Sequence, residues 1–252
     1  MLQAYFDDSA TNRQKPMVTA AGYVATVPQW ACFTERWCTC LSRWHLGEWK
    51  TTDWLARSGC YEGWSEGDRW QAFEEFAKIT EAHVLFGVSI SVQPEQYRAE
   101  VEAVLKQPDH AMADPFRWCL QGVLEHLVSE SLRVARDEPV AVILDKYARP
   151  EINVCLFNEV VAMLGAYAAL PSFTHADSVY FQPIQAADML ASVSRRSAED
   201  MVVKGQPNEG WELTRLREHV PIRVGHFTRA ALAGIRQRVM KMDNQGVFTT
   251  PE

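Results

Sequence analysis

Residues 140–145 read Val-Ala-Val-Ile-Leu-Asp, an apolar run without a polar interruption that ends on a carboxylate. Such a run is typical of a strand that other elements cover on both faces. A second short apolar run, Leu2–Phe6, ends on the carboxylates of Asp7 and Asp8. If the later strand returns parallel beside the first, Asp7 and Asp145 meet at a topological switch point, where open α/β sheets place their ligands.

The other expected elements are strands and helices in alternation. Small and β-branched residues predict further strands over residues 17–26, 83–92 and 172–179. Apolar residues at helical spacing predict helices over residues 30–44, 68–79, 94–105, 115–136, 152–166, 183–197 and 227–242. This order predicts an α/β fold: a mixed sheet flanked by helices, with a Trp-rich helical insertion at about 30–80 and a C-terminal helical extension at about 198–252. No linker or repeat divides the chain, so we expect a single domain over residues 1–252.

The composition excludes several classes of protein. Of the 252 residues, 47% are hydrophobic and 23% are charged, as in ordinary globular proteins, and no apolar stretch approaches the roughly 20 residues of a membrane span. The net charge of −7 means that any contact with nucleic acid must be local. The six cysteines are too sparse for a disulfide scaffold, and the first residues lack the layout of a signal peptide. We therefore expect a cytoplasmic protein with no membrane partner.

Asp188 is a third carboxylate with an unusual position. In the helix expected over residues 183–197 it follows Ile184 by four residues and precedes Ala191 by three, so it lies on the side that these apolar residues share. A carboxylate that faces inward needs a hydrogen-bond donor, a cation such as Arg195, or a metal ion.

Together the three carboxylates predict a chemistry that none of them predicts alone. Asp after a strand is common, because its side chain makes local turn bonds. Asp7, Asp145 and Asp188 in one pocket would instead repel one another unless divalent cations lay between them. Mg²⁺ and Mn²⁺ suit oxygen ligands, and a pair of such ions can activate water for an in-line displacement at a phosphodiester. The residues therefore predict a metal-dependent nuclease.

Four motifs also carry a resemblance to a known family. They are Tyr5-Phe6-Asp7-Asp8-Ser9-Ala10, Val142-Ile143-Leu144-Asp145, Asp177-Ser178 and Gln185-Ala186-Ala187-Asp188-Met189-Leu190-Ala191. In this order they resemble the domain-of-unknown-function family numbered 3800, which is usually placed in the ribonuclease H-like superfamily. The resemblance covers about residues 1–197 and implies a ribonuclease H-like sheet of five strands in the order 3-2-1-4-5. The family usually reads Asp-Glu-Ser-Gly at the first strand, where this chain has Asp8 for Glu and Ala10 for Gly.

The resemblance also implies roles for individual residues. The implied catalytic metal ligands are Asp7, Asp145 and Asp188, with Asp8 as a further candidate ligand. Gln185 is expected to face the substrate or to position another group, and Lys50, in a segment that resembles one of the family, is expected to contact a phosphate. The implied cofactor is Mg²⁺ or Mn²⁺, the implied partner is nucleic acid of unknown type, and the implied activity is hydrolysis of phosphodiester bonds by a two-metal carboxylate site.

Two alternatives stay open. Seven of the nine tryptophans lie between Trp30 and Trp70, where they either stack on unpaired bases or cover a core or a homodimer contact. Because Asp8 and Ala10 depart from the family's motif, the chain could also be a non-catalytic ribonuclease H-like module that binds nucleic acid or a protein. Convergence of the three carboxylates favours the nuclease, and their dispersal favours the binding module.

A basic stretch near the C-terminus is a further candidate contact. Residues 204–241 hold eight Lys or Arg against three Glu, opposite in sign to the whole chain. These charges either guide a polyanion toward the site or lie scattered on a solvated surface.

Overall fold

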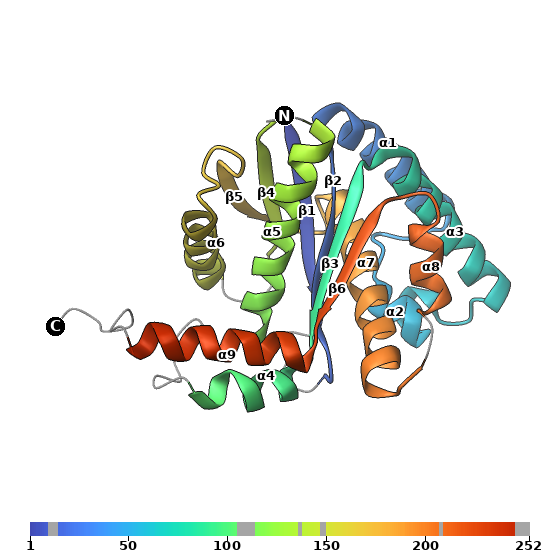
Figure 1. The fold of residues 1–252 in the computed structure, drawn as a ribbon. Coiled ribbons are helices and arrows are strands. Elements are labelled where there is room, and N and C mark those ends of the chain that lie inside the picture. The colour runs from blue at the N-terminus through green and yellow to red at the C-terminus, as the bar shows by residue number, and fades with distance from the viewer. Residues whose placement is uncertain (10–14, 105–113, 136–137, 147–149, 207–208, 245–252) are drawn as a thin grey trace.

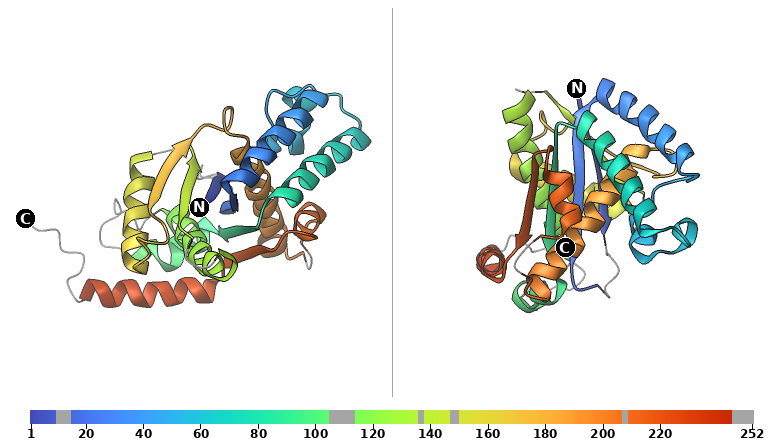
Figure 2. Two further views of the ribbon diagram at one scale, coloured as in Figure 1. Left: turned by 90° about the horizontal axis from the view of Figure 1, so that it is seen from above. Right: turned by 90° about the vertical axis from the view of Figure 1, so that its right-hand side faces the viewer.

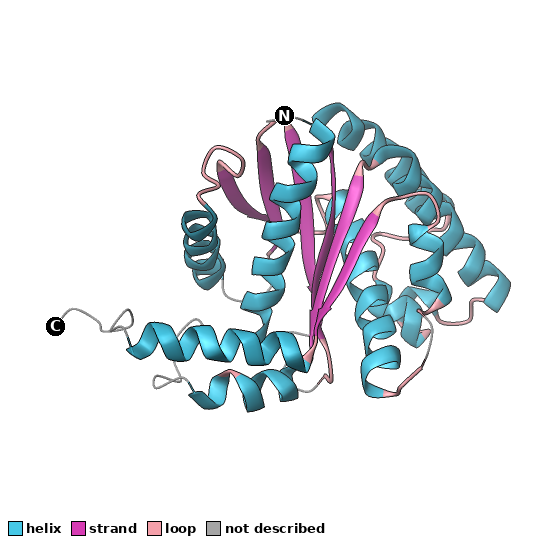
Figure 3. Cartoon of the chain, viewed as in Figure 1, coloured by secondary structure: helices cyan, strands magenta, loops and turns pink. Residues whose placement is uncertain are grey.

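A mixed sheet of six strands lies between two layers of helices in the computed structural model of the protein (Figures 1 and 2). The structure describes residues 1–9, 15–104, 114–135, 138–146, 150–206 and 209–244. The strands are β1 (Leu2–Ser9), β2 (Val18–Thr26), β3 (Phe86–Val92), β4 (Val140–Asp145), β5 (Ser172–Ala176) and β6 (Ile222–Phe227). The helices, shown in cyan in Figure 3, are α1 (Val27–Arg43), α2 (Thr51–Ala56), α3 (Glu66–His83), α4 (Pro94–Glu100), α5 (Pro115–Ala135), α6 (Pro150–Leu164), α7 (Gln182–Ala198), α8 (Trp211–Arg217) and α9 (Arg229–Asn244).

The sheet has the order β5-β4-β1-β2-β3-β6 among the described residues. β1 is central: it runs antiparallel to β2 and parallel to β4, with Phe6 opposite Leu144. The predicted mixed α/β architecture is confirmed, and the first five strands follow one another as predicted. The full order differs from the prediction because β6 pairs in parallel with the outer side of β3.

The prediction of five strands and of a purely helical C-terminal extension was therefore wrong. β6 reads Ile-Arg-Val-Gly-His-Phe, and it is largely exposed because it forms the edge of the sheet. An edge strand need not bury one face, so it lacks the apolar alternation by which a strand is recognised in a sequence. The third strand also begins later than predicted, at Phe86, because α3 continues to His83.

Each face of the sheet covers a separate hydrophobic core. On one face, Ala4 and Phe6 of β1 pack in a core that α4, α5, α6 and α9 complete. On the other face, Tyr5 of β1 packs in a core that α1, α2, α3, α7 and α8 complete. Residues of β1 thus alternate between the two layers, as the pleat of a strand requires.

The Trp-rich segment forms much of the second core. α1, α2 and α3 lie between β2 and β3 in the chain, and α1 begins at Val27, earlier than predicted, behind a capping box of Thr26 and Gln29. Trp37, Trp49 and Trp54 are almost completely buried, and the centroid of Trp49 lies 4.6 Å from that of Phe76. Their rings therefore stabilise the core and are inaccessible to unpaired bases.

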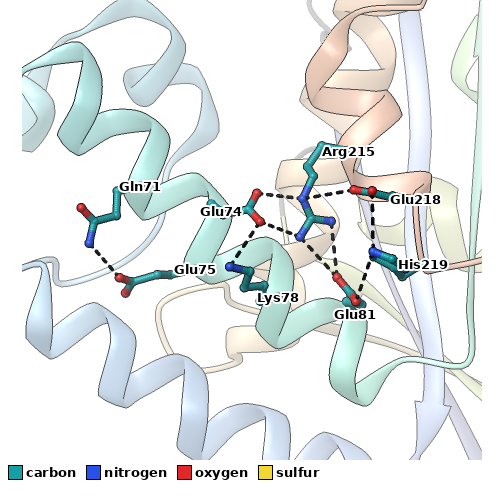
Figure 4. A network of polar contacts seen from close by, with 8 residues as sticks. All are labelled: Gln71, Glu74, Glu75, Lys78, Glu81, Arg215, Glu218 and His219. Carbon is teal, nitrogen blue, oxygen red and sulfur yellow. Dashed lines mark hydrogen bonds and ion pairs between the residues drawn. The ribbon is translucent and has the colours of Figure 1, made fainter.

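Arg215 fastens α8 to α3 (Figure 4). Its Nε lies 2.7 Å from Oε2 of Glu74 and its Nη2 lies 2.8 Å from Oε1 of the same carboxylate, while Glu81 accepts two longer bonds of 3.3 Å. The hydrogen bonds from Arg215 lower the pKa of Glu74. This bidentate geometry is the strongest form of a carboxylate–guanidinium pair.

Replacing Arg215 by Gln is expected to lower the free energy of unfolding by about 1–2 kcal/mol at pH 7, since solvent screens the partly exposed Glu74. Because the pKa of Glu74 is lowered, this contribution is present above the ordinary Glu value of 4.5 and is lost as the pH falls through the lowered value. Chemical denaturation of both proteins at several pH values measures this contribution to the free energy of unfolding. Arg217→Gln, which removes an exposed pair with Glu209, is the control, and an equal loss in both variants would contradict the assigned role of Arg215.

Candidate functional site

The fold brings Asp7 and Asp145 to the same level of the sheet. They are the residues that follow the paired Phe6 and Leu144 on neighbouring parallel strands. Both lie on the face of the Tyr5 side chain, toward the layer of α7. Asp7 and Asp145 are 7% and 6% exposed, so both carboxylates are largely removed from water.

Asp188 approaches the same face from α7. Asp188 itself is partly exposed, and its charge raises the pKa of Asp7 on β1, which agrees with the predicted inward direction. The backbone N–H of Thr51, at the start of α2, donates to Oδ2 of Asp188 at 2.9 Å, and the hydroxyl of Ser192 donates to Oδ1 at 3.2 Å. The partners of this carboxylate are therefore neutral donors, not the guanidinium of Arg195.

Arg195 has a different role. Its Nε donates to the hydroxyl of Ser9 at 3.1 Å, and its Nη1 donates to Glu199 at 2.9 Å. It thus joins the end of β1 to the far end of α7.

The pKa of each of the three carboxylates is raised, chiefly by burial. Burial raises the pKa of Asp7 well above its usual range, and the charges of Asp188, Asp8 and Asp145 raise it further. Burial also raises the pKa of Asp145, although the backbone N–H groups of Lys146 and Ser178 partly offset the effect. For Asp188 burial is again the main cause of a raised pKa, against the hydrogen bonds from Thr51. The site therefore concentrates negative charge in a region of low water content.

Lys50 supplies a positive charge at this site. Its Nζ lies 3.3 Å from the hydroxyl of Ser178 and 3.3 Å from Oε2 of Glu48. Burial opposes its charge, but the carboxylates of Glu48, Asp188 and Asp145 raise its pKa. Sequence reasoning missed Glu48, because it lies in a loop and belongs to no motif that would mark it.

Gln185 connects three segments that surround the site. Its side-chain oxygen accepts from Nε1 of Trp37 and from the backbone N–H of Trp49, both at 2.9 Å, and its amide nitrogen donates to the carbonyl of Ser178 at 2.7 Å. The side chain has no exposed surface. Of the two roles expected for Gln185, the structure therefore fits positioning of the loops that carry Lys50 and Ser178, and it does not fit direct contact with a substrate.

Asp8 does not join the other three aspartates. It follows Phe6 by two residues in a strand whose pairing with β2 continues without a bulge to Ser9. Its side chain therefore points to the α5 layer, whereas that of Asp7 points to the α7 layer. The prediction of Asp8 as a metal ligand does not fit this placement.

The chemistry of the remaining donors fits a hard cation. They are carboxylate oxygens, and the charges of Asp188 and Asp145 raise the pKa of Asp7, a repulsion that a divalent cation would remove. Within the part of the chain that the structure describes, no three side chains of His, Cys, Asp or Glu lie close enough to hold one ion among themselves. Mg²⁺ is commonly bound by only one or two carboxylates, with water and substrate phosphates as its other ligands.

Removal of the Asp7 charge is expected to stabilise the metal-free protein at neutral pH. Because the folded state holds the Asp7 proton more tightly than the unfolded state, stability falls as the pH rises from the ordinary value of 3.8 through the raised one. Asp7→Asn should therefore raise Tm at pH 7 in the presence of EDTA, by about 2–4 °C for each kcal/mol of repulsion removed, and the gain should vanish near pH 4. Thermal melts over this pH range measure the difference.

The control is Glu35→Gln, which removes an exposed carboxylate from α1. A gain in Tm that was independent of pH, or one that Glu35→Gln shared, would contradict the repulsion assigned to Asp7.

The basic C-terminal stretch is mostly used in ion pairs. Arg215 binds Glu74, Arg223 binds Glu130, and both Arg229 and Arg236 approach Glu100. These charges are thus largely neutralised, which disfavours the interpretation of the stretch as a guide for a polyanion. Among the described helices, none is long and apolar enough to cross a bilayer.

Comparisons with known proteins add little to these observations. No protein-family model matches the chain, and no curated protein matches it in sequence. The chain is similar to one in a solved structure of the PCNA:RNase HII complex from Archaeoglobus fulgidus, with 13% identity over 99% of this chain and 92% of that chain and a TM-score of 0.43. A similarity of this size supports no conclusion about function.

Proposed function

We propose that this protein is a ribonuclease H-like, divalent-metal-dependent nuclease that hydrolyses phosphodiester bonds of nucleic acid. The observation that carries the proposal is the meeting of Asp7 and Asp145, from neighbouring parallel strands, with Asp188 on one face of the sheet, where their charges raise the pKa of Asp7. Buried carboxylates that repel one another destabilise the fold unless they bind a ligand of opposite charge.

Each residue has a distinct role in the proposal. Asp7, Asp145 and Asp188 would share the ligation of Mg²⁺ or Mn²⁺, with one or two carboxylates to an ion and water and substrate phosphate as its other ligands, and the metal would supply an activated water and neutralise charge at the phosphodiester. The ammonium group of Lys50 contacts a phosphate oxygen of the substrate. The N–H of Thr51 and the hydroxyl of Ser192 fix the orientation of the Asp188 carboxylate.

Calorimetric titration of Mn²⁺ tests the proposed metal site directly. The wild-type protein is expected to bind Mn²⁺, and Asp188→Asn is expected to bind it at least about tenfold more weakly, because one ligand charge is lost. Glu35→Gln should bind as the wild type does. Absence of binding, or equal affinity of wild type and Asp188→Asn, would contradict the metal site and favour the non-catalytic binding module.

A further inference from the structure

A second site is formed by a pocket of about 400 Å³ on the same side of the sheet. Residues of α2 and α3 line one side of it, and residues of α7 and α8 line the other. On α7 the pocket is lined by Val193, Arg196 and Ser197, which lie five to nine residues beyond Asp188 and therefore about 8–14 Å along the helix. The pocket is thus separate from the carboxylate site, and its volume is typical of a pocket for a small molecule.

Three guanidinium groups line this pocket: those of Arg57, Arg69 and Arg196. Arg69 is only 4% exposed, and one of its nitrogens, Nη2, donates to the carbonyl of Trp54 at 2.6 Å. Its Nε is buried and has no hydrogen-bond partner among the described residues. A buried cation without a carboxylate partner is costly, so an anion in the pocket would compensate the charge of Arg69.

The acidic residues of the pocket are already bonded to other groups. Asp200 accepts from Lys204 at 2.8 Å, and Glu212 lies 3.6 Å from Nη1 of Arg196. Glu66 accepts a hydrogen bond from Nε1 of Trp70 at 3.4 Å. Within the described ranges, Arg57 and Arg69 have no carboxylate at ion-pair distance. Arg57 and Arg196 also repel the Arg69 charge, whose pKa is lowered chiefly by burial.

An aromatic wall lies beside these cations. Trp70 of α3 and Trp211 of α8 both line the pocket and meet edge to face, with centroids 4.1 Å apart. Trp211 is 46% exposed, although α8 is fastened to α3 by Arg215. The wall is therefore held in place before any ligand binds, and it offers apolar surface next to the guanidinium groups.

We propose that this pocket binds a phosphate monoester of the size of a nucleotide. Arg57 and Arg196 donate to the phosphate oxygens, the buried positive charge of Arg69 lies behind them, and the ring system of the ligand packs against Trp70 and Trp211. The phosphate belongs either to a free mononucleotide or to the 5′ end of a strand. The site acts independently of the metal ion of the proposed nuclease.

Calorimetry in the presence of EDTA tests the proposal. AMP should bind, and adenosine should bind at least about tenfold more weakly, because it lacks the phosphate. The exposed Arg57 and Arg196 can be changed without disturbing the core, so Arg57→Gln and Arg196→Gln should each weaken AMP binding about tenfold. Arg36→Gln, at an exposed position of α1, is the matched control and should leave AMP binding unchanged.

A short oligonucleotide, tested with and without a 5′-phosphate, distinguishes a free mononucleotide from the 5′ end of a strand as the source of the phosphate. Binding of AMP alone supports a site for a free nucleotide, and binding of the phosphorylated oligonucleotide alone supports a site for a strand end. The proposal is overturned if neither binds, if adenosine binds as well as AMP, or if Arg36→Gln weakens binding as much as the pocket variants do. Since EDTA removes divalent ions, a failure of the nuclease proposal does not alter these outcomes.

Discussion

Asp145→Asn is expected to lower metal-dependent cleavage of nucleic acid by at least about 10³-fold, because the proposed role of Asp145 is to hold an ion that supplies several kcal/mol of charge stabilisation in such reactions. Cleavage is measured with Mg²⁺ or Mn²⁺ on single-stranded RNA, single-stranded DNA, duplexes and an RNA–DNA hybrid. Asn keeps the size of the side chain, so the loss reports the charge of Asp145.

The stability of the same variant separates loss of chemistry from loss of fold. Burial raises the pKa of Asp145, so removal of its charge should leave Tm unchanged or raise it at pH 7. Glu35→Gln, on the exposed side of α1, should cleave as the wild type does. Cleavage that persists in Asp145→Asn, or that does not depend on metal, would contradict the proposed nuclease site.

Gln185→Leu is expected to lower the free energy of unfolding by about 3–5 kcal/mol. The change leaves three buried groups without their partner: the indole N–H of Trp37, the backbone N–H of Trp49 and the carbonyl of Ser178. Each unsatisfied buried group costs about 1–3 kcal/mol. For a chain of this size the expected fall in Tm is about 10 °C.

Chemical denaturation of Gln185→Leu measures this loss, and Gln71→Leu is the matched control. Gln71 lies on the exposed side of α3, where its amide donates to Glu75, so the same substitution should change stability by less than about 0.5 kcal/mol. An equal effect at both positions would show that Gln185 does not hold the loops around the site.

The placement of Asp7, Asp145 and Asp188 on one face of the sheet could be predicted from local patterns, whereas their convergence on a single ion is not found among the described residues. Asp7 and Asp145 each end an apolar run typical of a strand, and helical spacing places Asp188 on the inward side of its helix. These two patterns, with the assumption that the two strands pair in parallel, are enough to place the three side chains on one side of the sheet. The placement of Asp8 could have been predicted as well, because adjacent residues of a strand point to opposite faces.

Other parts of the fold and the site could not be predicted in this way. The contact between Gln185 and Trp37 joins residues 148 positions apart, and only the packed structure determines it. Glu48 lies in a loop without a pattern, and β6, a solvated edge, has no apolar signal. The arginines of the second pocket come from three separate helical regions, and no spacing in the sequence relates them.

The position of β6 has a consequence for the minimal functional unit. Asp7, Asp145 and Asp188 all precede residue 198, so a shortened protein that ended with α7 would retain every proposed metal ligand. It would, however, uncover the whole length of β3, which is buried in the complete fold, and leave a row of open backbone donors and acceptors along a hydrophobic strand. Exposed hydrophobic edge strands of this kind pair with those of other molecules and cause aggregation. β6 thus protects β3 from pairing with another molecule, although it contributes no carboxylate to the proposed chemistry.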